Sequence, residues 1–116
     1  MGRFDATVFN GQRQSTSATY LQQHPANLTI LTDTRALRVG FSGNKATALE
    51  VSNNGISQTI TARREVISCL GAFESPKLLM LSGVGPADHL RRHGIEPVVD
   101  LSGVGQSLQD LSLIHI

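Results

Sequence analysis

The stretch that decides the fold covers residues 71–85 and reads GAFESPKLLMLSGVG. Ser75 is a favoured helix N-cap residue, because its hydroxyl can accept a hydrogen bond from a free backbone N–H. Pro76 suits the first helical position, where its missing N–H does no harm. Gly83 and Gly85 allow the backbone to turn with positive φ. These local choices predict a short helix that leads into a glycine-rich turn.

The residues on either side extend this pattern. The preceding run Glu65–Leu70 is short and nearly continuously apolar, which is typical of a fully buried parallel strand. We expect one helix over Pro76–Ser82 and a second over Pro86–His93. Gly94 then fits the left-handed stop position, and Ile95 can fold back onto the second helix as in a Schellman ending. The sequence thus predicts a strand–helix–turn–helix unit.

The first half of the chain favours short strands. Four segments carry strand-like patterns, with polar turn residues between them: Asn27–Thr32, Ala36–Phe41, Ala46–Val51 and Ile56–Ala62. Arg13–Leu21, rich in hydroxyls, predicts a short helix or turn. We therefore expect an α/β fold made of a small antiparallel meander, one strand of a parallel sheet and two short helices.

Composition argues against several classes of partner. The chain has 116 residues and a formal net charge of +1, with Lys and Arg scattered along it, so neither nucleic acid nor a membrane surface is an expected partner. Apolar runs fall far short of the roughly 20 residues that a membrane span needs. No secretory signal pattern opens the sequence. Cys69 is the single cysteine, which excludes an internal disulfide, and we expect it to be a small buried packing residue.

Candidate catalytic side chains are few. His89 and His93 have the spacing of a two-histidine metal face, but no third ligand is evident, and the two arginines between them in the sequence would repel a cation. A solvated helix face is therefore the favoured interpretation. His24 is expected to be exposed in a polar loop. Three serines, Ser15, Ser17 and Ser75, lack the Gly-x-Ser-x-Gly elbow of a hydrolase nucleophile.

Several of these stretches together resemble a known family. The order Gly, Ser-Pro, paired aliphatics and Ser-Gly-x-Gly in residues 71–85 resembles the second signature of the glucose–methanol–choline (GMC) oxidoreductases. Residues 11–21 (GQRQSTSATYL), 27–39 and 104–110 (VGQSLQD) resemble further family stretches. The resemblance covers nearly all of residues 2–110. It implies an FAD/NAD(P)-binding-type domain, FAD as cofactor and a small-molecule alcohol as substrate.

The resemblance also implies two cofactor-contacting residues. Family members usually have Val in the strand where Ala36 stands, and its main chain meets the adenine of FAD. Gly71 is expected to let the backbone approach the cofactor, because a larger residue would place a Cβ in the way. At two positions the chain departs from the family pattern, with Ser107 where Asn is usual and Leu111 where His is usual.

The resemblance predicts that the chain is an interior portion of a longer enzyme. The family's Gly-x-Gly-x-x-Gly unit, which receives the FAD pyrophosphate, has no counterpart here, and neither has its distal catalytic histidine. We expect residues 1–110 to be a partial FAD-binding domain, weakly stable and inactive alone. Two other hypotheses stay open: a stand-alone, non-catalytic β-rich interaction module, and a family member repurposed to a non-redox reaction.

The last residues, 111–116, read LSLIHI and break the family pattern. One frame of the end sequence of a common transposase sequencing adapter, CTGTCTCTTATACACATC, encodes the same residues. We therefore expect this segment, which includes His115, to be translated adapter rather than native sequence.

Overall fold

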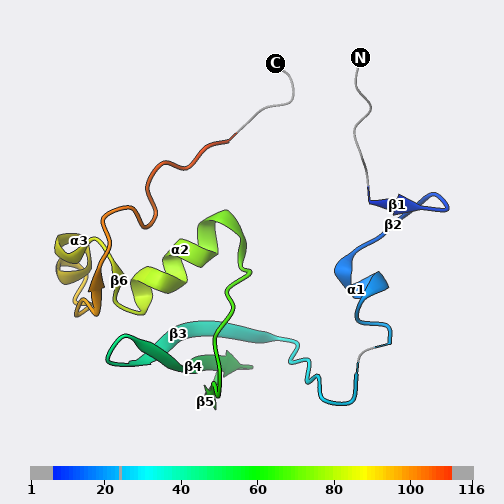
Figure 1. Ribbon diagram of the computed structural model, residues 1–116, viewed down its shortest axis with the longest axis horizontal. Coiled ribbons are helices and arrows are strands. Elements are labelled where there is room, and N and C mark those ends of the chain that lie inside the picture. The colour runs from blue at the N-terminus through cyan, green and yellow to red at the C-terminus, as the bar shows by residue number, and fades with distance from the viewer. Residues whose placement is uncertain (1–6, 24, 111–116) are drawn as a thin grey trace. The chain divides into compact units, whose positions relative to one another are not determined.

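The computed structural model describes residues 7–23 and 25–110 (Figure 1). The chain divides into two units, Met1–Thr32 and Asp33–Ile116, and each is described by itself. His24, His115 and the suspected adapter segment lie outside the described residues, so the expectations for them stay predictions.

The first unit contains a small hairpin and one turn of helix. Strands β1 (Val8–Phe9) and β2 (Gln12–Arg13) pair antiparallel. Asn10 and Gly11 between them both have positive φ, as a type I′ turn requires. Helix α1 (Thr16–Thr19) confirms the short helix predicted there.

The cap of α1 also explains one candidate serine. The Ser15 hydroxyl accepts a hydrogen bond from the Ala18 N–H at 3.1 Å, so its role here is structural. The strand predicted over Asn27–Thr32 is wrong. That segment has no strand partner among the described residues, and its alternating pattern cannot form a ladder alone.

The second unit is built on a three-stranded antiparallel sheet. Strands β3 (Thr34–Ser42), β4 (Lys45–Asn53) and β5 (Ile56–Thr61) follow one another in the order β3-β4-β5. This confirms the last three of the four strands predicted for the meander. Two-residue turns connect the strands, one with Gly43 at positive φ and the other with both Asn54 and Gly55 at positive φ.

The segment after β5 does not follow the sequence prediction. Glu65–Leu70 is neither a strand nor buried: Ile67 keeps 75% of its surface exposed, and Cys69 is exposed as well. The predictions of a buried parallel strand and a buried cysteine are therefore wrong for this structure. A parallel strand needs neighbours from distant parts of a chain, and the described residues supply none to this segment.

Helix α2 (Gly71–Leu81) begins five residues before the predicted start at Pro76. Ser75 thus lies inside the helix and does not cap it; the N-cap residue is Leu70. Pro76 is tolerated in the helix, at the expense of the hydrogen bond that its missing N–H would give to the carbonyl of residue 72.

The end of the unit follows the prediction closely. Helix α3 (Ala87–Arg92) is followed by Gly94 at φ +71, with hydrogen bonds from Ile95 N–H to Leu90 O and from Gly94 N–H to Arg91 O, both 3.0 Å. This is the predicted Schellman ending. Strands β6 (Val84–Gly85) and β7 (Val99–Asp100) form a short parallel pair beside it.

The core is small and lies where α2, α3 and the sheet meet. Its buried apolar residues are Val39, Val51, Leu78, Val84, Ala87 and Leu90. In contrast, Phe73 on α2 is 72% exposed and Leu108 is 58% exposed. None of the described helices is long and apolar enough to cross a membrane. Overall the unit has the mixed α/β architecture expected of it.

Candidate functional site

Ala36 lies on β3, at the edge of the three-stranded sheet as far as the described residues extend. It is half-buried and pairs with Val51 on β4. The register slips directly after it, so that Leu37 forms a bulge before pairing resumes at Arg38. An edge strand keeps one row of backbone N–H and C=O groups outside its sheet, where a planar polar group can meet them.

Gly71 is the first residue of α2 and has φ +84. A Cβ built on it meets no atom of the described chain within 4 Å, and the residue is exposed. Leu70 before it makes no side-chain capping hydrogen bond. The start of α2 therefore combines backbone N–H donors, the positive end of a helix dipole and open space in front of the glycine.

The structure places Ala36 beside the start of α2. A hollow of about 480 Å³ lies between the start of β3 and the start of α2. Its walls are Asp33, Thr34, Arg35, Ala36, Leu70 and Glu74. Ala36 thus shares a hollow with the residue that directly precedes Gly71, although the two are far apart in the sequence.

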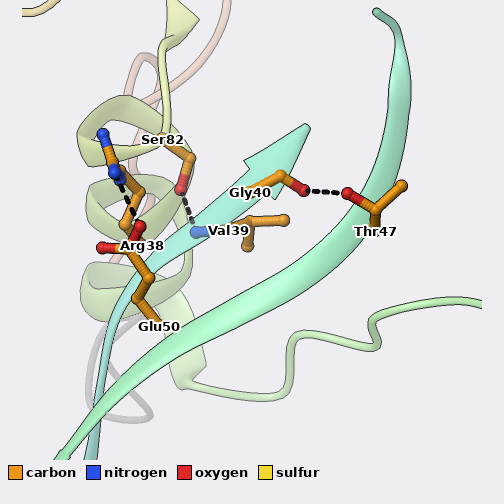
Figure 2. A network of polar contacts seen from close by, with 6 residues as sticks. All are labelled: Arg38, Val39, Gly40, Thr47, Glu50 and Ser82. Carbon is orange, nitrogen blue, oxygen red and sulfur yellow. Dashed lines mark hydrogen bonds and ion pairs between the residues drawn. The ribbon is translucent and has the colours of Figure 1, made fainter. Parts of the chain in front are cut away.

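A buried serine connects the two elements that form this hollow. Ser82, the C-cap residue of α2, is 5% exposed. Its Oγ accepts a hydrogen bond from the Val39 N–H at 2.8 Å and donates one to the Leu78 carbonyl at 2.5 Å. Figure 2 shows the bond from β3 to Ser82. No local pattern in the sequence singles out a role for Ser82, although it stands in the Ser-Gly-x-Gly part of the signature.

The two glycines after Ser82 have different roles. Gly83 has φ +87, and its carbonyl accepts hydrogen bonds from Val98 N–H at 2.7 Å and Val99 N–H at 3.1 Å. Gly85 does not have positive φ, so the prediction for it is wrong; a Cβ there would lie 3.0 Å from the Met80 Cγ. Gly85 is thus needed for space rather than for its backbone angle.

An ion pair crosses the sheet next to the Ser82 contact. Arg38 Nη2 on β3 lies 2.6 Å from Glu50 Oε1 on β4 (Figure 2). The hydrogen bond to Glu50, and then its negative charge, raise the pKa of Arg38 above its ordinary value. The Arg38 side chain is exposed and that of Glu50 is partly exposed, so solvent screens the pair and it contributes little to stability.

The histidine pair on α3 stands apart from this hollow. The rings of His89 and His93 lie 4.7 Å apart, edge to face, and both residues are exposed. Within residues 7–23 and 25–110, no group of three or more His, Cys, Asp or Glu side chains could hold a metal ion. Asp88 on the same helix is engaged with Arg91 at 3.3 Å.

Comparison with known proteins identifies the family of this chain. A family model described as GMC oxidoreductase matches residues 1–112. The chain belongs to the GMC oxidoreductase family. Membership in the GMC family confirms the resemblance seen in residues 71–85 and in the stretches around them.

Curated GMC relatives match along almost the whole chain. An oxygen-dependent choline dehydrogenase of Staphylococcus saprophyticus is 45% identical over 99% of this chain. One from Brucella ovis is 41% identical, also over 99%. This chain corresponds to 21% of each relative, so it spans about a fifth of the length of the curated relatives it matches.

Solved structures of GMC-like proteins share the fold. A formate oxidase of Aspergillus oryzae RIB40, studied for FAD modification, matches with a TM-score of 0.83 and 37% identity. That match covers 90% of this chain and 18% of the oxidase. A pyridoxine 4-oxidase from Mesorbium loti matches with a TM-score of 0.73 and 36% identity, over 80% of this chain and 19% of its own.

Proposed function

We propose that residues 7–110 form part of the FAD-binding domain of an FAD-dependent oxidoreductase that acts on the CH–OH group of a small alcohol. One observation carries the proposal: Ala36, on the edge of the sheet, and the start of α2 line the same hollow. Membership in the GMC family supports FAD as the group that the hollow receives. The relatives are named as choline dehydrogenases and as oxidases, which supports a small organic substrate.

The residues around the hollow suit FAD. The backbone of Ala36 would offer edge-strand hydrogen bonds to one part of the cofactor, and its small side chain leaves room for it. Gly71 would let a second part approach the start of α2, where backbone N–H groups favour negative charge. FAD, when bound, would supply the hydride-accepting chemistry of alcohol oxidation.

The chain's own contribution is positioning. Neither Ala36 nor Gly71 carries a side chain that can move a proton, so we assign both to binding. Glu74, one of the charged residues at the hollow, is partly neutralised because it forms an ion pair with Lys77 at 3.0 Å. A β-rich interaction module would not require a glycine at φ +84 in front of open space, and the family match does not favour it.

The proposal can be tested in a hybrid enzyme, defined as the Staphylococcus saprophyticus relative in which residues 7–110 of this chain replace the matching segment. We expect this hybrid to purify with bound flavin. Gly71→Asn should then abolish flavin binding, because Asn tolerates positive φ but its side chain fills the space in front of the helix.

Gly94→Asn is the matched control. Gly94 also has positive φ and open space around its Cβ position, but it lies at the end of α3. This variant should keep its flavin. Equal flavin content in both variants, or a hybrid that folds without binding flavin, would refute the proposal.

A further inference from the structure

The hydrogen bond between Ser82 and β3 is a long-range contact in a buried place. Ser82 and Val39 are 43 positions apart in the sequence, and both are buried. A hydroxyl can donate one hydrogen bond and accept others, and the hydroxyl of Ser82 does both. The bond to Leu78 O fixes the hydroxyl on α2, and the bond from Val39 N–H fixes β3 against it.

Apolar packing alone would not define the position of α2 along β3. Leu78 and Val39 are buried where α2 packs on β3, and burial of apolar surface is non-directional. A hydrogen bond prefers a narrow range of distance and angle, so it defines where the end of α2 lies along the strand. Figure 2 shows the Ser82 hydroxyl directed at the backbone of β3.

The two proposed cofactor contacts sit on the two elements that Ser82 joins. Ala36 is three residues before Val39 on β3, and Gly71 is at the opposite end of α2 from Ser82. Helix α2 has eleven residues and is about 16 Å long. A small change in its tilt at Ser82 therefore shifts Gly71, at its other end, relative to β3.

We propose that Ser82 is a positioning residue for FAD: its hydroxyl sets the separation between the edge of β3 at Ala36 and the start of α2 at Gly71. This inference rests on the proposed function. Ser82 is not among the residues that line the hollow, and it acts through the two elements that it connects.

The test uses Ser82→Ala in the hybrid enzyme, with two measurements: the dissociation constant for FAD after flavin removal, and the unfolding midpoint of the flavin-free protein. We expect the dissociation constant to rise by up to about tenfold, because the free energy of the lost buried hydrogen bond is the upper limit of what the substitution takes from FAD binding. Ser82→Thr keeps the hydroxyl and should restore tight binding. Ser82→Cys keeps a weaker hydrogen-bonding group, so its dissociation constant for FAD should lie between those of Ser82→Ala and Ser82→Thr. With three variants, the poor folding of one does not decide the outcome.

Asp100→Ala is the control for a purely structural effect. Asp100 Oδ1 accepts a hydrogen bond from the Ala87 N–H at 3.0 Å, which is the same type of contact but joins β7 to α3. It should lower the unfolding midpoint with no change in the affinity for FAD. If Ser82→Ala and Asp100→Ala change both quantities alike, Ser82 is only structural and the inference is overturned. A parent hybrid that binds no flavin instead overturns the proposed function and this inference with it.

Discussion

Gly83 allows the sharpest prediction from this structure. With φ +87, alanine at this position would be strained by about 1–2 kcal/mol. Its Cβ would also lie 2.8 Å from Glu96 O, 2.9 Å from Val98 Cγ2 and 3.1 Å from Val98 N. Two of these three atoms are backbone, so relief requires the segment 96–98, just before β7, to move away from Gly83. Overpacking of this kind costs about 1–3 kcal/mol, and Gly83→Ala should therefore destabilise the fold by about 2–5 kcal/mol.

The measurement is chemical denaturation of the hybrid enzyme, with Gly94→Ala as the matched variant. Gly94 has φ +71 but no atom within 4 Å of its Cβ position, so only the strain of about 1–2 kcal/mol applies to it. The difference between the two variants isolates the close approach of Gly83 to the backbone of residues 96–98. Equal midpoints for the two variants would refute this explanation of Gly83.

Three other substitutions test separate parts of the fold. Leu90→Ala removes a side chain that is 1% exposed and should destabilise by about 2–5 kcal/mol, which a shift in the denaturation midpoint would measure. Ser107 has φ +55, where Asn is better tolerated than Ser, so Ser107→Asn should raise the thermal midpoint; an unchanged or lower value would contradict this. Glu50→Gln removes the ion pair with Arg38 and should cause a small decrease in the free energy of unfolding at low salt. At high salt the variant and the parent should be equally stable, because salt screens the pair.

The turns of the second unit and the end of α3 could be predicted because local chemistry decides them. Asn54-Gly55 suits a type I′ turn in any context, and Gly94 ends α3 through contacts within five residues. The three strands of the meander follow from such turns. The start of α2 was mispredicted because Ser75-Pro76 is a strong local start signal, whereas the structure begins the helix at Gly71 and accommodates the proline.

Features that depend on distant partners could not be predicted from residue types alone. Glu65–Leu70 has the composition of a parallel strand, yet a strand exists only where neighbours pair with it. The importance of Ser82 depends on a contact across 43 positions that no local pattern reveals. Ala36 has no distinctive chemistry, and only the family resemblance singled it out as a cofactor residue.

The central claim is that FAD lies against the backbone at Ala36 and at the start of α2. A crystal structure of the flavin-bound hybrid enzyme tests it directly. We predict cofactor density along the edge of β3 at Ala36 and in front of Gly71, within the hollow that both elements line. Bound flavin that leaves this hollow filled only by solvent would contradict the claim.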